Sequence, residues 1–247
     1  MKSSTRQTQS GAAATRAALV RELAALASPA RAAGAAKFFK SGAGEYGEGD
    51  KFIGIPVPAL RNAALRYRAL PLPDLALLLA SAIHEHRLAA LEILVAQYEV
   101  AAEDERKNIV EFYLENTQGI NNWDLVDASA PYILGEHLKT RSRRLLVRLA
   151  KSKSLWERRM AIVATLMLVR NGETVDTFLI AEKLLRDPHD LIQKAVGWAL
   201  RETGKVSQAE LLAFLERHYA SMSRTTLRYA IERFPQQRRK RMLAGKF

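Results

Sequence analysis

Apolar residues recur at intervals of three and four along most of the chain, which is the pattern of amphipathic helices. Between Ala12 and Ala27, for example, Leu19, Leu23 and Leu26 fall on one stripe. Segments of roughly 10 to 17 residues repeat this pattern downstream and alternate with short turns. The pattern predicts an all-α protein.

Glycine and proline mark the boundaries between these segments. The glycine-rich stretch from Ser41 to Asp50 predicts an ordered loop, because glycine permits left-handed backbone and disfavours a long helix. Pro56 and Pro58 predict a helix that starts near Pro58. Further breaks are expected at residues 70–73, 101–103, 119–122, 139–140, 151–154, 171–173, 187–188 and 203–207.

Pairing the predicted helices produces units of roughly 30 to 40 residues, a period typical of helical-repeat proteins. We therefore expect an α-solenoid of stacked antiparallel helical hairpins with a concave face. Residues 12–247 are expected to form one domain and residues 1–11 to be disordered. The N-terminal residues Lys2, Arg6 and Arg16 weakly resemble a transit peptide, but we favour a frayed bacterial N-terminus.

Composition narrows the possible functions. Hydrophobic residues make up 48% of the 247 positions, enough for a large core or a continuous array. The chain has no cysteine, which excludes disulfides, thiolate zinc sites and thiol catalysis and suits a reducing, cytoplasmic compartment. No apolar run is long enough to predict a membrane span.

The net charge of +12 predicts attraction to polyanions, and the charge is unevenly distributed. Residues 139–170 contain ten Lys or Arg and one acid, whereas residues 91–127 contain nine acids and two basic residues. A basic run on one helix is usually a solvated face. Because several consecutive helices share the bias here, we favour a concave basic wall that contacts phosphates.

Several motifs are weak. Residues 42–47 match G-x-G-x-x-G but follow no strand and place Glu45 where a pyrophosphate would bind, so we reject a dinucleotide site. Glu45, Glu48 and Asp50 lack the spacing of a calcium loop, so a structural loop is favoured.

His84 and His86, separated by one residue, are expected to be solvated in a turn, because no third zinc ligand is near in sequence. We therefore predict no metal and no cofactor. Motifs of common hydrolases and nucleoside triphosphatases are also absent from the sequence.

Residues 119–127 carry the strongest chemical signal. Asn122 is a good cap for a helix that sets Trp123 and Asp127 one turn apart on one face. Asp124 lies in the first turn, where the helix dipole favours a carboxylate. Asp127 lies deeper, among apolar neighbours, so it should be paired or functional.

The two other tryptophans also lie near cations. Trp156 stands close to Arg158 and Arg159, and Trp198 follows Gly197. A core position is the usual explanation for a single tryptophan. Glycine inside a helix costs stability, so Gly197 indicates close approach by another helix or by a ligand.

Four segments together resemble the AlkD-type bacterial DNA alkylation-repair glycosylases, which are built from HEAT-like helical repeats. The resemblance covers residues 34–235 and implies the same fold. It rests on Phe38–Lys40 with Gly47–Gly54, Asn122–Asp127, Leu155–Ile162 and Ile192–Glu202.

The resemblance implies that Asp127 is the catalytic carboxylate and that Trp123 and Trp198 are aromatic walls around the lesion or sugar. It also implies that Arg159 contacts DNA. Residues 188–192 carry no aromatic side chain where some members have a pair near the lesion, which leaves lesion preference open. We add Phe38, Arg148, Arg158 and Lys194 as expected DNA contacts.

The resulting functional hypothesis is a monomeric glycosylase that excises N3- or N7-alkylated purines from double-stranded DNA in base excision repair. A non-catalytic DNA-structure binder is the first alternative, and it predicts binding without base release. A protein-binding solenoid is the second, and it predicts weak, salt-independent DNA affinity. Asp127 with its two tryptophans favours the enzyme, and the basic tract argues against a protein-binding solenoid.

Overall fold

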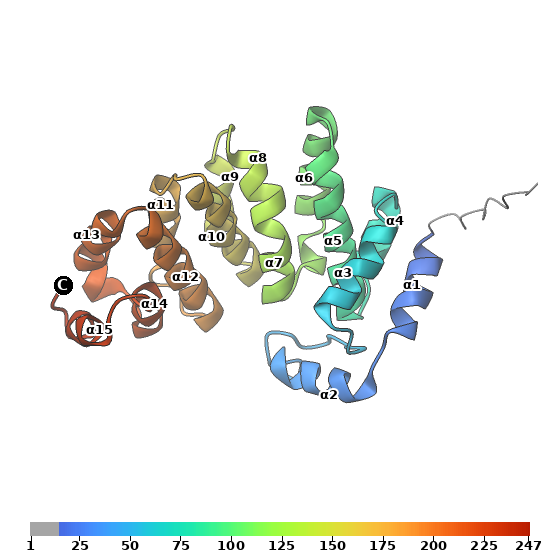
Figure 1. Cartoon of the computed structure of the whole chain (residues 1–247), viewed down its shortest axis with the longest axis horizontal. Helices are drawn as coiled ribbons and strands as arrows, with labels where there is room; N and C mark the ends of the chain where they lie inside the picture. The colour runs from blue at the N-terminus through green and yellow to red at the C-terminus, as the bar shows by residue number, and fades with distance from the viewer. Residues whose placement is uncertain (1–14) are drawn as a thin grey trace, which may run out of the picture.

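The computed structural model describes residues 15–247 and shows an all-helical array, as expected from the sequence pattern (Figure 1). Two short 3₁₀ turns, η1 (Thr117–Gly119) and η3 (Tyr219–Ser221), connect some of the helices. The α-helices are α1 (Arg16–Ala25), α2 (Pro29–Phe38), α3 (Val57–Arg66), α4 (Leu72–Leu79), α5 (His84–Val100), α6 (Glu103–Glu115), α7 (Trp123–Ala130), α8 (Glu136–Leu138), α9 (Arg144–Ala150), α10 (Leu155–Arg170), α11 (Val175–Leu184), α12 (Asp190–Val206), α13 (Gln208–His218), α14 (Arg224–Ala230) and α15 (Gln236–Leu243).

Successive helices follow one another along an arc from α1 to α15, with α2 and α14 on the same side of it (Figure 1). The helices α10, α12 and α14 pack side by side, and α9 and α11 pack beside them. One continuous apolar core runs through the array, from Leu19 in α1 to Met242 in α15. The expected α-solenoid is therefore confirmed.

The helix that carries Asp127 is longer than α7 alone. α7 continues through a π-helical segment, η2 (Pro131–Gly135), into α8 without a break in direction. Proline cannot donate the backbone hydrogen bond of an α-helix interior, and a π-turn is one way to accommodate it. This continuous helical segment ends at Leu138, which confirms the break predicted at residues 139–140.

Gly197 allows two helices of the array to touch. A Cβ atom at this position would lie 2.4 Å from Tyr229 Cβ and 2.6 Å from the Thr226 carbonyl oxygen. The glycine therefore lets α12 and α14 pack in direct backbone contact. The close approach predicted from the sequence is that of a neighbouring helix.

Three expectations need correction or limitation. The sequence predicted only a short helical patch around residues 37–40 before the glycine-rich loop, whereas α2 fills residues 29–38. His84 and His86 were expected to be solvated in a turn, but they open α5 and are 2% and 8% exposed. The predictions for residues 1–11 lie outside the described residues. Among the described helices, none is long and apolar enough to cross a membrane.

Candidate active site

A groove of about 860 Å³ lies where α2, α7, α10, α12 and α14 approach one another. Asp127 and Arg159 line it together with aromatic side chains from both of its walls. It collects six of the eight residues predicted to contact the lesion or DNA: Phe38, Trp123, Asp127, Arg159, Lys194 and Trp198.

Asp127 is held in this groove by a bidentate ion pair. Arg159 Nε donates to Asp127 Oδ1 at 2.9 Å, and Arg159 Nη2 donates to Asp127 Oδ2 at 2.8 Å. The remaining Arg159 nitrogen, Nη1, donates to the Leu191 carbonyl oxygen at 2.7 Å. The guanidinium is therefore fixed by α7 and by the start of α12, and it fixes the carboxylate in turn.

The electrostatics of Asp127 combine two opposing effects. Burial raises the pKa of Asp127 above its ordinary value, and the charge and hydrogen bonds of Arg159 oppose that rise. The Asp127 side chain keeps 20% of its surface exposed, against 6% for Arg159. The carboxylate is thus desolvated but still reachable from the groove.

Trp123 belongs to an aromatic cluster that joins α2 to α7. Its ring stacks on Phe39, with centroids 5.3 Å apart, and meets Phe38 edge-on at 5.8 Å. Phe39 also stacks on Phe52 at 5.2 Å. Phe38 is 65% exposed, so an apolar ring stands at the rim of the groove where a partner can reach it.

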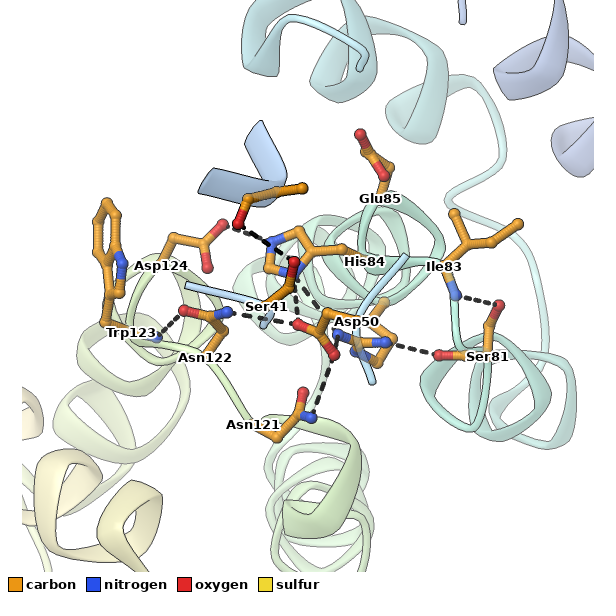
Figure 2. A network of polar contacts seen from close by, with 12 residues as sticks. Ser41, Asp50, Ser81, Ile83, His84, Glu85, Asn121, Asn122, Trp123 and Asp124 are labelled. Carbon is orange, nitrogen blue, oxygen red and sulfur yellow. Dashed lines mark hydrogen bonds and ion pairs between the residues drawn. The ribbon is translucent and has the colours of Figure 1, made fainter. Parts of the chain in front are cut away.

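A buried polar network lies beside Trp123 (Figure 2). His84 bridges two carboxylates, with Nδ1 3.2 Å from Asp50 Oδ2 and Nε2 2.8 Å from Asp124 Oδ2. Arg87 Nη2 pairs with Asp50 Oδ1 at 2.6 Å and Arg87 Nη1 donates to the Ser81 carbonyl oxygen at 2.7 Å. The network ties the glycine-rich loop, the start of α5 and the start of α7 into one unit.

The two carboxylates beside His84 favour its protonated form. Burial alone would lower the pKa of His84, but the hydrogen bonds to Asp124 and Asp50 outweigh it and raise the pKa above 6.5. Burial likewise opposes ionisation of Asp50, yet His84, Arg87 and Asn122 lower the pKa of that carboxyl. Both imidazole nitrogens face carboxylates, so the imidazolium is the form that satisfies both contacts.

The start of α7 is fixed by the same loop. Asn122 caps the helix by accepting a hydrogen bond from the Trp123 backbone N–H at 2.8 Å, while its Nδ2 donates to Asp50 at 3.3 Å. A Cβ atom at Gly47 would lie 2.5 Å from the Phe39 carbonyl oxygen. Glycine at this position lets the loop close over the end of α2 and the start of α7.

The structure does not bring Arg158 and Arg148 into the groove. Arg158 Nε pairs with Asp187 at 2.6 Å, and its Nη1 donates to the carbonyl oxygens of Ser152 and Lys153. Arg148 is exposed on α9 and lines a separate hollow with Glu157. Arg158 therefore connects the turn before α10 to the turn before α12, and Arg148 faces a different part of the surface.

The basic tract of residues 139–170 is also used differently from the expectation. Arg143 pairs with Glu173 and Asp176 in the next repeat, and Arg141 pairs with Glu103 in the preceding one. These cations join repeats rather than line the groove. Four cations line the groove: Lys40 after α2, Arg159 of α10, and Lys194 and Arg201 of α12.

Several residues of the site were not predicted from the sequence. Tyr46 and Tyr229 line the groove, and His84 and Arg87 stand behind it. Asp50 at the end of the glycine-rich loop and the polar run His84–Arg87 that opens α5 were the available signal for such a network. Within residues 15–247 no three His, Asp or Glu side chains group as metal ligands.

Comparison with known proteins decides the family. The sequence model of a family described as DNA alkylation repair enzyme matches residues 19–234. The chain belongs to the DNA alkylation repair enzyme family. DNA is therefore the partner of this DNA alkylation repair protein, and its role is in DNA repair.

A solved structure shares the fold of this DNA alkylation repair protein. It is a predicted DNA alkylation repair enzyme from Enterococcus faecalis, with a TM-score of 0.65 and 18% sequence identity. The match covers 85% of this chain and 97% of that chain. Among curated proteins, none matches the sequence.

Proposed function

We propose that this family member is a DNA glycosylase that hydrolyses the N-glycosidic bond of N3- or N7-alkylated purines in double-stranded DNA. The observation that carries the proposal is the position of Asp127, a desolvated carboxylate clamped by Arg159 in a groove that also holds Trp123 and Trp198. A carboxylate fixed in this way can stabilise a developing positive charge without reorganising.

The chemistry follows from the charge of the lesion. Alkylation at N3 or N7 makes the purine cationic, so the bond from C1′ to the base nitrogen breaks with its electron pair leaving on the base. The sugar then carries an oxocarbenium-like charge, which Asp127 stabilises as carboxylates do in glycoside hydrolysis. Water adds to C1′, and its proton passes to Asp127 or to solvent.

The two tryptophans supply selectivity for charged bases. A cation over an indole face is attracted by about 0.5 to 2 kcal/mol. A neutral lesion has neither this attraction nor a built-in leaving-group charge. We therefore expect little release of uracil or 8-oxoguanine by the purified protein.

The test compares the wild type with Asp127→Asn for release of 3- and 7-methylpurines from alkylated duplex DNA, with DNA affinity measured at matched salt. Asn keeps the shape of the side chain and removes its charge. Asp104→Asn is the matched control, because that carboxylate is 93% exposed on α6 and lies outside the groove. We expect Asp127→Asn to bind DNA and to lose at least about 100-fold in release, as is typical when a charge-stabilising group is removed.

A second candidate function is that of a non-catalytic DNA-structure binder. It is favoured by the bidentate pairing of Asp127, which by itself satisfies the carboxylate. The same experiment separates the two candidates. Wild-type protein that binds alkylated duplex DNA but releases no base would establish the binder and reject the glycosylase.

A further inference from the structure

Positive charge is concentrated at the C-terminal end of the chain. Residues 217–247 contain nine Lys or Arg and a single acid, Glu232, so that this segment carries +8 of the net charge of +12. We call these cations the C-terminal basic surface: Arg217, Arg224, Arg228, Arg233, Arg238, Arg239, Lys240, Arg241 and Lys246.

The charge of this surface is not neutralised within the described part of the chain. None of its nine cations forms an ion pair there, although Arg141, Arg143 and Arg158 upstream all do. The acid of the same segment, Glu232, pairs instead with Arg201 of the groove. Like charges at neighbouring helical positions repel one another, so this arrangement favours a polyanionic partner.

The cations are held on an ordered helix rather than on a free tail. Met242 of α15 is fully buried, and the Tyr219 hydroxyl donates to the Leu243 carbonyl oxygen at 3.0 Å. Arg238 lies over the Phe234 ring, 4.9 Å from its centroid. Lys240 and Arg241 consequently project from a docked helix, with their backbone positions fixed.

Helix α14 contributes to both the groove and the C-terminal basic surface. Tyr229 of α14 lines the groove beside Lys194 and Trp198, and the preceding residue, Arg228, is exposed. α15 follows α14 at the end of the arc (Figure 1). The family match ends at residue 234, so α15 (Gln236–Leu243) lies outside the matched segment.

We propose that the C-terminal basic surface binds the phosphate backbone of duplex DNA on one side of the lesion and extends the footprint of the groove. The inference takes the identity of the polyanion from the proposed function. It assigns to α15 no part in base release. Lesion and base sequence have no influence on these contacts, because phosphates carry no sequence information.

The test is the salt dependence of DNA affinity for the variant Arg233→Gln, Lys240→Gln, Arg241→Gln. All three side chains are exposed, so their replacement leaves the core intact. A control variant changes three exposed cations away from the groove: Arg68→Gln, Arg144→Gln and Lys183→Gln. Undamaged and lesion-containing duplexes of about 12 and about 30 base pairs are compared, since about 10 base pairs make one helical turn.

On the long duplex we expect the slope of log affinity against log salt to become shallower by about 0.9 for each phosphate that the variant no longer neutralises, and affinity at low salt to fall roughly 10- to 100-fold. The effect should be equal for undamaged DNA and absent on the short duplex. An unchanged slope on the long duplex, or an equal change in the control variant, would overturn the proposal.

Base release is measured in parallel on the same duplexes at saturating protein. Release by the wild type with an unchanged slope in the C-terminal variant rejects the basic surface and leaves the glycosylase in place. A changed slope without any base release by the wild type rejects the glycosylase and supports the C-terminal basic surface. The two proposals therefore fail separately.

Discussion

Arg159 clamps Asp127 from a helix 32 residues further along the chain, through hydrogen bonds of 2.9 and 2.8 Å to its two carboxylate oxygens. Because the third guanidinium nitrogen is anchored to the Leu191 carbonyl oxygen, Arg159 cannot follow Asp127 if that side chain rotates. The pair thus fixes both the position and the charge of the carboxylate.

The pH dependence of base release should report the ionisation of Asp127. Burial raises the pKa of Asp127 above 3.8, so the acid limb of the rate should lie above the pH at which an ordinary Asp titrates. Single-turnover release of 7-methylguanine is measured from pH 4 upward, with spontaneous depurination subtracted. A rate that stays flat down to about pH 4 would contradict a need for ionised Asp127.

Replacing Arg159 by Met should move this acid limb to higher pH, because the cation that opposes the burial effect is removed. Breaking a buried ion pair by removing one partner also costs about 3–5 kcal/mol of unfolding free energy. Arg158→Met is the matched control on the same helix, since Arg158 pairs with Asp187 and not with Asp127. The control should lose stability and keep the wild-type limb, and an equal shift in both variants would reject the assignment.

His84→Gln should destabilise the protein in a pH-dependent way. The folded pKa of His84 is raised, so its contribution is complete below pH 6.5 and is lost as pH rises through the folded pKa. Because the pKa of Asp50 is lowered, its contribution to the free energy of unfolding is complete above pH 3.8. The difference in unfolding free energy between wild type and His84→Gln should therefore be greatest between those pH values and smaller at pH 9. Denaturant unfolding measures it, and a difference that grows with pH would contradict the imidazolium.

Gly197→Ala should destabilise the contact between α12 and α14 by about 1–3 kcal/mol, because the new methyl group would meet backbone and Cβ atoms. Gly34→Ala in α2 is the control, since a Cβ there meets nothing within 4 Å. That change should be neutral or stabilise the helix by up to about 1 kcal/mol. The thermal unfolding temperature should fall for Gly197→Ala and not for Gly34→Ala, and equal destabilisation would mean that helix packing is not the constraint at Gly197.

Trp198→Ala should lower the rate of release of cationic bases by roughly 2- to 30-fold, the equivalent of about 0.5 to 2 kcal/mol of cation–π attraction. Trp198→Phe keeps a weaker aromatic face, so its release rate should lie between those of the wild type and Trp198→Ala. The measurement is the single-turnover rate with protein in excess over DNA but below saturation, so that weaker binding of the cationic base lowers the rate. An alanine variant as fast as the wild type would remove Trp198 from the proposed site.

Local pattern was enough to predict most of the helices, the capping of α7 by Asn122 and the placement of Trp123 and Asp127 on one helix face. These features depend on neighbouring residues, on helical periodicity and on the conformational limits of proline and glycine. The sequence also predicted that Asp127 is paired or functional, since a carboxylate among apolar residues is costly when isolated.

Only the tertiary structure identified the partner. Arg158 and Arg159 cannot be told apart from the sequence. Successive residues of a helix point about 100° apart, so Arg158 pairs with Asp187 whereas Arg159 pairs with Asp127. His84 was predicted to be solvated, but in the structure it is the centre of a buried network, because residues distant in the sequence pack around it. Asp50 and Asp124, its two partners, lie 34 and 40 residues away, and only the packing of the loop against α5 and α7 brings them together.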